Sequence, residues 1–151
     1  MCLHKTIQKT DTNIIEIASK DIICYKLVKH SSFLLQSAQK WFIKDSIDYY
    51  SFYQLFPVEF NKLFIERNFA KTVKETVKDY LKCFKNSNYL CLKFGQDMFH
   101  SFVNRSDAYA LHSGIEVVEC VIPKGSKYIK GTADNGAENY GSERIIYKRI
   151  L

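Results

Sequence analysis

The run ECVIPKGSKYIKG, residues 119–131, carries the sharpest turn signal in the chain. An apolar segment ends at Pro123, which presets the backbone for a tight turn, and Gly125 supplies the positive φ that such a turn favours. A second strand-like segment, residues 127–131, then follows. The pattern predicts a β-hairpin with lysines on its turn and its exit, and raises the question of whether this basic hairpin binds a ligand or only builds a sheet.

The sequence on both sides of this run extends the strand pattern. Residues 115–122, IEVVECVI, are apolar on both faces, which is typical of an interior strand. Residues 131–141, GTADNGAENYG, are rich in Gly, Asn and Asp and are expected to form a flexible loop. The run ERIIYKRI, residues 143–150, predicts the final strand.

The clearest single element is FAKTVKETVKDYLKCFK, residues 69–85. Apolar side chains recur in it at spacings of three and four, and charged side chains fill the remaining positions. This pattern predicts a long amphipathic helix, which the turn residues 86–88 can end. A short helix is expected within residues 104–114, where Asn or Ser can cap the start and Gly114 can stop the end.

The first half of the chain is expected to add further strands. Residues 21–28, DIICYKLV, are β-branched and aromatic enough for a strand. Residues 89–94 and 98–103 predict a second hairpin around a turn at 95–97.

The remaining segments are less regular. The aromatic stretch 31–56 is expected to contain short strands near residues 41–43 and 51–56. Residues 1–12 are polar and are expected to be a loose N-terminal segment. The whole chain, 1–151, therefore predicts a single α+β domain with a small, mostly antiparallel sheet, one long amphipathic helix and one short helix.

The composition bounds the class of protein. The 151 residues are 46% hydrophobic and 25% charged, which is the balance of a globular domain. The five cysteines form no CxxC pair and have no histidine at ligand spacing, so we expect no metal site, no cofactor and a reducing compartment. With no signal peptide or membrane-length apolar run, the expected location is the cytoplasm and no membrane partner is expected.

The net charge of +6 and the 15% share of aromatic residues suggest where a partner binds. Three sets of side chains are candidates: lysines on one face of the long helix, an aromatic stretch, and lysines of the predicted hairpin. They are Lys71, Lys74, Lys78, Lys82 and Lys85; Trp41, Tyr49, Tyr50 and Tyr53; and Lys124, Lys127 and Lys130. Each set also has a structural interpretation, as a solvated helix face, core packing and ordinary strand alternation respectively.

Four segments, DIICYKLV, FHSFVNRSDAYA, VVECVIPKGSKYIKG and SERIIYK, resemble in this order a family of small bacteriophage and bacterial proteins with no assigned activity. The resemblance covers the N-terminal and C-terminal thirds, and residues 31–89 lie outside it. Met98 stands where the family has glycine, and Ser142-Glu143-Arg144 replaces its usual SDK. The resemblance implies a phage-type host-interaction protein that binds a host protein or ribonucleoprotein, including inhibitors of bacterial defence of the anti-CRISPR kind, in the bacterial cytoplasm.

An enzyme is the competing class. The strand order and the late acidic residues are also similar to ADP-ribosyltransferases, which would use nicotinamide dinucleotide and need an early-strand cation and a late-strand glutamate. Lys26 is the cation available here, and Glu138 and Glu143 are the late carboxylates. His100 is a second candidate for acid–base chemistry, and Cys120 a nucleophile if a histidine lies beside it.

Direct nucleic-acid binding is the third class. Lysines alternate with tyrosines in PKGSKYIK and IIYKRI, where they can contact phosphates and stack on bases. Strand alternation produces the same pattern for structural reasons, so the sequence leaves this class open.

Overall fold

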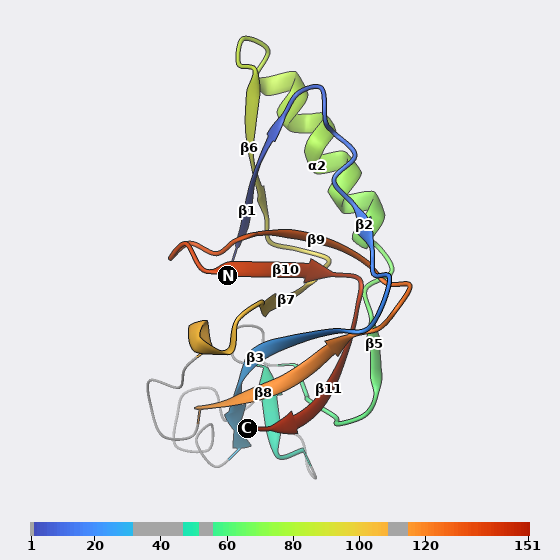
Figure 1. The fold of residues 1–151 in the computed structure, drawn as a ribbon, viewed down its shortest axis with the longest axis vertical. Coiled ribbons are helices and arrows are strands. Elements are labelled where there is room, and N and C mark those ends of the chain that lie inside the picture. Colours follow the sequence, from blue (N-terminus) through green and yellow to red (C-terminus); the bar gives the residue numbers. More distant parts are fainter. Residues whose placement is uncertain (1, 32–46, 52–55, 109–114) are drawn as a thin grey trace.

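The computed structural model describes residues 2–31, 47–51, 56–108 and 115–151 (Figure 1). Its strands form one antiparallel sheet in the order β5-β11-β8-β3-β7-β10-β9-β1-β6, with β2 beside β9 and β4 beside β3. The strands are β1 (Leu3–Gln8), β2 (Glu16–Ile17), β3 (Ile22–His30), β4 (Tyr49–Ser51), β5 (Leu63–Ile65), β6 (Tyr89–Phe94), β7 (Phe99–Phe102), β8 (Ile115–Ile122), β9 (Lys127–Thr132), β10 (Glu138–Ser142) and β11 (Arg144–Ile150).

The expectation of an α+β fold with one long and one short helix is wrong. The described residues form a mostly antiparallel sheet of eleven strands with a single α-helix, α2 (Phe69–Cys83). In the segment expected to be the short helix, Arg105–Asp107 form one 3-10 turn, η2, after an extended Asn104 that makes no side-chain cap hydrogen bond. Residues 109–114 lie outside the described part of the chain.

The turn after β8 exists, but the predicted hairpin does not. Gly125 has a φ of 86°, and the Ser126 amide donates to the Pro123 carbonyl oxygen at 3.0 Å. β8, however, pairs with β3 and β11, whereas β9 pairs with β10, β1 and β2. The turn therefore carries the chain from one half of the bent sheet to the other, as Figure 1 shows.

Two further expectations about the pairing of segments are wrong. The predicted hairpin of β6 and β7 is wrong, because β6 pairs with β1 and β7 pairs with β10 and β3. Residues 131–141 are not a flexible loop, because they complete a regular hairpin of β9 and β10. Its turn is closed by the Ala133 amide, which donates to the Ala137 carbonyl oxygen at 2.8 Å, and by Gly136 at a φ of 86°.

The upper half of the molecule in Figure 1 is built around α2. The predicted helix is confirmed, and its buried side chains Phe69, Val73 and Val77 pack into a core with strands β1, β6 and β9. β6 alternates exposed and buried residues along its length, as a strand with one covered face does.

The N-terminal segment contributes to this upper core. Leu3 and Ile7 on β1 are buried beside α2, and β1 pairs with β6 over its whole length. The expectation of a loose segment at residues 1–12 is therefore wrong, because the two apolar side chains, four positions apart, both reach the covered face of the sheet.

A second core lies in the lower half of the molecule. It consists of side chains from β3, β8 and β11 together with Val58: Cys24, Val28, Val118, Cys120, Ile122, Ile145 and Tyr147. β3 and β8 pair in register over eight residues, with Cys24 directly opposite Cys120. The two buried cysteines are thus core residues, as their apolar neighbours in the sequence predict.

Candidate functional site

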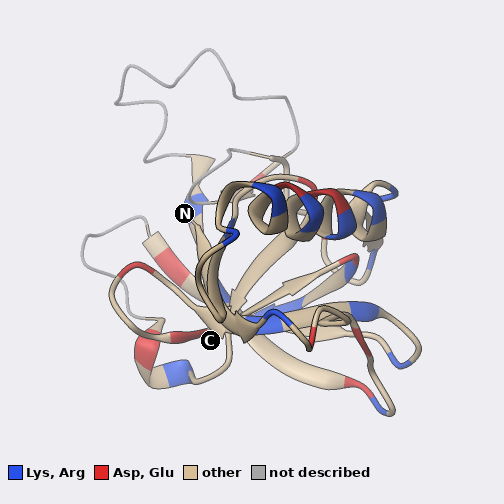
Figure 2. Cartoon of the chain, turned by 90° about the horizontal axis from the view of Figure 1, so that it is seen from above, with Lys and Arg blue, Asp and Glu red and all other residues tan. Residues whose placement is uncertain are grey.

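Five lysines form a continuous stripe along the outer face of α2 and its C-terminal extension. Lys71, Lys74, Lys78, Lys82 and Lys85, called the lysine stripe below, are all exposed. Lys71, Lys74, Lys78 and Lys82 follow one another at spacings of three, four and four, so their side chains share one side of the helix, and Lys85 lies in the turn two residues after the end of α2. Figure 2 shows the basic bands repeating along the length of α2.

The lysine stripe forms no ion pair in the part of the chain that the structure describes. Two exposed carboxylates nevertheless lie beside it on α2: Glu75 is four residues from Lys71 and three from Lys78, and Asp79 is three residues from Lys82. Lys82, in the last turn, also interacts favourably with the helix dipole. The stripe is therefore a net basic surface in which lysines outnumber carboxylates.

The predicted hairpin lysines do not form a second such surface. Lys124 is exposed on the turn, Lys127 is half-buried, and the Lys130 ammonium lies 3.7 Å from a Glu138 carboxylate oxygen. The backbone amides here hold the turn in place, since the Lys127 amide donates to the Glu143 carboxylate at 3.0 Å. The backbone of residues 123–127 therefore builds the corner of the sheet.

Of the four aromatic candidates, one is buried, one is half-buried and two lie outside the residues that the structure describes. Tyr50 is fully buried, so the prediction that it contacts a partner is wrong: β4 packs that side chain into the protein. Tyr49 is half-buried, with its ring edge-on to those of His30 and Phe60 at centroid distances of 5.1 and 6.0 Å. Trp41 and Tyr53 lie outside the described residues.

His100 is a buried side chain of β7. Its Nε2 lies 3.2 Å from the Gly95 carbonyl oxygen, and its Nδ1 is buried without a hydrogen-bond partner in the described structure. Burial lowers the pKa of this imidazole to about 4, because the charged form loses its hydration, and the nearby Lys26 charge acts in the same direction. The neutral ring therefore donates from Nε2 and ties β7 to the preceding turn.

The cation and the carboxylates that an ADP-ribosyltransferase would need are engaged separately. The Lys26 ammonium donates to the His100 carbonyl oxygen. Glu138 pairs with Lys130, while Glu143 accepts the Lys127 amide and lies 3.5 Å from the Arg144 guanidinium. Each carboxylate thus has a structural role, and no recorded contact joins either one to Lys26.

Lys26 is largely buried, and its nearest titratable neighbours are the thiols of Cys24 and Cys120. Burial lowers the pKa of the Lys26 ammonium and raises the pKa of the Cys24 thiol beside it to about 11. Burial also raises the pKa of Cys120 and of Tyr147 well above their ordinary values. A raised pKa argues against Cys120 as a nucleophile, because the thiol stays protonated.

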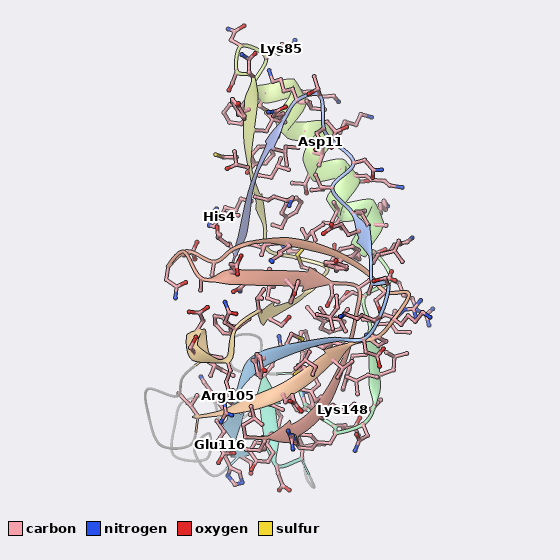
Figure 3. All side chains as sticks on the ribbon, viewed as in Figure 1. His4, Asp11, Lys85, Arg105, Glu116 and Lys148 are labelled. Atoms are coloured by element: carbon pink, nitrogen blue, oxygen red, sulfur yellow. The ribbon has the colours of Figure 1, made fainter. Side chains whose placement is uncertain are left out.

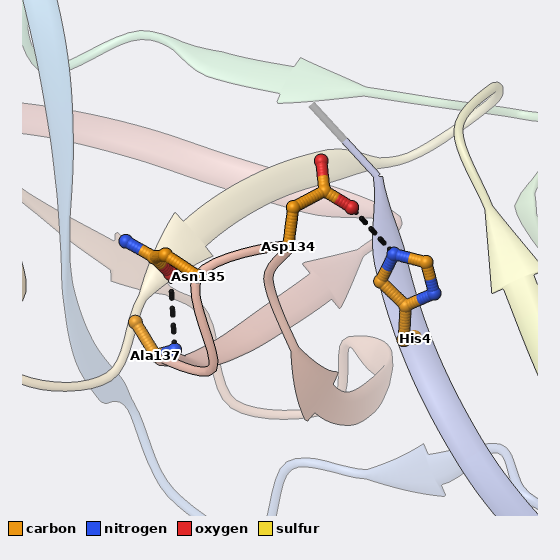
Figure 4. A network of polar contacts seen from close by, with 4 residues as sticks. All are labelled: His4, Asp134, Asn135 and Ala137. Atoms are coloured by element: carbon orange, nitrogen blue, oxygen red, sulfur yellow. Dashed lines mark hydrogen bonds and ion pairs between the residues drawn. The ribbon is translucent and has the colours of Figure 1, made fainter.

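A second polar cluster joins the N-terminal strand to the β9–β10 turn (Figure 4). The His4 Nε2 lies 2.5 Å from an Asp134 carboxylate oxygen, and the Asn135 side-chain oxygen accepts the Ala137 amide at 3.0 Å. The hydrogen bond from His4 lowers the pKa of Asp134. Both side chains of this pair are exposed to water. The contact therefore links β1 to the β9–β10 turn at the protein surface and contributes little to stability.

Charged side chains lie at both ends of the molecule. Figure 3 places Lys85 at the far tip of the α2 end and Glu116 and Lys148 at the opposite end. Within the described residues, no helix is both long and apolar enough to cross a bilayer.

Comparison of the chain with protein-family models, with curated proteins and with solved structures finds no match.

Proposed function

We propose that this protein acts by stoichiometric binding to a bacterial host protein or ribonucleoprotein, and that the lysine stripe of α2 is its contact surface. The observation that carries the proposal is a row of four exposed lysines on one side of α2, continued by Lys85 just beyond its end, none of which forms an ion pair among the described residues. A partner with an acidic or phosphate-bearing surface matches this charge.

The scaffold supports a binding role for the stripe. α2 is anchored through Phe69, Val73 and Val77, so the opposite side of the helix can meet a partner without being reordered. A surface held in its bound conformation loses less conformational entropy on association. The positive field also accelerates encounter with an anionic partner, and this acceleration weakens as salt is added.

The nature of the target rests on the resemblance to phage and bacterial proteins. Small basic proteins of phage type that bind host components include inhibitors of defence systems, and a CRISPR ribonucleoprotein offers both acidic protein surface and exposed phosphate. We therefore propose inhibition of such a defence complex as the consequence of binding.

The test is an affinity capture of the tagged protein from a bacterial lysate, with and without nuclease, followed by mass spectrometry. The test variant carries Lys74→Glu, Lys78→Glu and Lys82→Glu in the stripe. The matched control carries Lys20→Glu, Lys93→Glu and Lys148→Glu at exposed positions elsewhere, which changes the net charge equally. One partner at near-equal stoichiometry should survive nuclease and the control substitutions but be lost from the stripe variant.

Three other outcomes contradict the proposal in different ways. Loss of every captured partner after nuclease indicates direct nucleic-acid binding, which a steep fall of affinity with salt would support. Equal loss in the two triple variants shows that net charge matters and the stripe does not. Absence of any partner directs attention to the enzyme class, with nicotinamide dinucleotide as the first ligand to test.

A further inference from the structure

A cavity of about 440 Å³ opens beside β5 and the segment that precedes it. Its walls come from five strands and the segment before β5, and include Lys26 on β3, Phe64 on β5, Phe99 on β7 and Tyr147 on β11. This volume lies within the range of about 300–1,000 Å³ found for small-molecule sites, which are apolar with a few polar groups. The cavity thus has the size and the lining of a ligand site.

Lys26 is the unusual member of this lining. Its ammonium has three N–H donors, and the described structure provides one acceptor, the His100 carbonyl oxygen. No described carboxylate forms an ion pair with Lys26, and its titratable neighbours Cys24 and Cys120 are thiols that burial keeps protonated. A largely desolvated ammonium without a counter-ion is unfavourable, and burial accordingly lowers the pKa of Lys26. A ligand that brings a negative charge stabilises the ammonium form of Lys26 and is therefore favoured in this site.

Two glutamates restrict how much negative charge the ligand can carry. Glu59 and Glu66 also line the cavity; Glu59 is paired with Lys62 at 2.6 Å, while the carboxyl of Glu66 is partly buried. Repulsion from these carboxylates grows with the charge of the ligand, so a dianion such as a phosphate ester is disfavoured more than a monoanion, whose single charge the Lys26 ammonium can balance. The aromatic walls, Phe64 and Phe99, suit an apolar body.

We propose that this cavity binds a small apolar monocarboxylate, with the Lys26 ammonium as the counter-ion of its carboxylate and the aromatic walls around its body. The site lies on different elements from the lysine stripe, and its occupation does not depend on the partner proposed above. Sequence reasoning names Lys26 only as a cation on an early strand. It misses Glu66 and Phe64, which the pairing of β5 with β11 brings beside Lys26.

The test compares three probes of similar shape by isothermal titration calorimetry at neutral pH and low salt. The probes are 4-phenylbutanoate, its neutral analogue 4-phenylbutanamide, and 1,1-difluoro-3-phenylpropylphosphonate, whose fluorine atoms keep the phosphonate a dianion at neutral pH. The carboxylate should bind about tenfold or more tightly than the amide, because a charge-assisted hydrogen bond is lost with the amide. It should also bind more tightly than the phosphonate.

Two variants assign this preference to Lys26. Lys26→Met keeps an unbranched apolar stem and should bind carboxylate and amide equally, while the control Lys148→Met, at an exposed position outside the cavity, should behave as wild type. Should Lys26→Met fail to fold, Lys62→Glu tests from an exposed lining position whether the carboxylate of the ligand lies in this cavity. It changes the local charge by two units and leaves Glu59 without its ion pair, so it should weaken the carboxylate severalfold and the amide much less.

Each alternative outcome overturns the proposal. Equal affinity of wild type for carboxylate and amide shows that Lys26 is not a counter-ion. Tighter binding of the phosphonate shows that the site takes a dianion instead. No heat of binding from any of the three probes at millimolar concentration shows that the cavity is not a site for this class of ligand.

Discussion

The ammonium of Lys26 on β3 donates a hydrogen bond to the backbone carbonyl oxygen of His100 on β7. The contact crosses the place where the sheet bends, since β3 pairs with β8 over eight residues but shares a single residue pair, Tyr25 with Phe102, with β7. One side chain therefore helps to join the two halves of the sheet and also lines the cavity between β3 and β5.

Acid should destabilise the protein through His100. Its pKa is about 4 in the folded state and about 6.5 when unfolded, so the unfolded state binds the proton first as the pH falls. The stability that His100 contributes is complete above pH 6.5 and is lost toward pH 4, by up to about 3 kcal/mol. Urea unfolding at pH 7.5, 5.5 and 4.5 measures the change.

The variant His100→Gln isolates this effect from that of the carboxylates. Glutamine keeps a donor for the Gly95 carbonyl oxygen but does not titrate. The free energy of unfolding should therefore fall less steeply with acid in the variant than in the wild type. The same pH dependence in both proteins would show that His100 is not the group responsible.

Four of the five thiols should fall into two reactivity classes. Cys83 and Cys91 are exposed, while Cys24 and Cys120 are fully buried with raised pKa values. Alkylation at pH 8, followed by peptide mass spectrometry, should modify the exposed pair within minutes and the buried pair only when urea unfolds the protein. Rapid labelling of Cys24 in the native protein would contradict its place in the lower core.

Gly131 should not tolerate a side chain. A Cβ at this position would lie 2.3 Å from the His4 carbonyl oxygen and 3.1 Å from Leu3 Cγ, where β9 meets β1. Gly131→Ala should lower the free energy of unfolding by about 1–3 kcal/mol, because two paired backbones must move apart. The control Gly95→Ala has its nearest such contact at 3.8 Å, with Cys2 Sγ, and should change stability much less.

The anchoring of α2 can be measured separately from its surface. Phe69 is fully buried, so Phe69→Ala should cost about 3–5 kcal/mol of unfolding free energy through lost burial and the cavity left behind. Lys78→Ala, on the exposed side of the same helix, should stay within about 0.5 kcal/mol of wild type. Chemical unfolding of the two variants gives both values, and a large cost for Lys78→Ala would mean that the stripe is structural.

Local patterns account for the elements that the sequence predicts well. The spacing of apolar residues in 69–85 gives α2, because a helix brings residues three and four apart onto one face regardless of the rest of the chain. The runs at 21–28, 115–122 and 143–150 become β3, β8 and β11 for a similar reason, and Pro123 with Gly125 gives the turn. The candidate lysines of α2 follow from the same periodicity.

The pairing of the strands, and with it the cavity, came from contacts between distant parts of the chain. Pro123 and Gly125 predict a turn, but they do not determine which strands pair on either side of it. β8 pairs with β3 and β11, with which it forms the lower core, and not with β9. The polar, glycine-rich residues 131–141 contain the end of β9, a turn and most of β10, and β10 forms because β9 and β7 supply hydrogen-bonding partners on both of its sides. Lys26, Glu66 and Phe64 likewise meet in one cavity through pairings that no local pattern specifies.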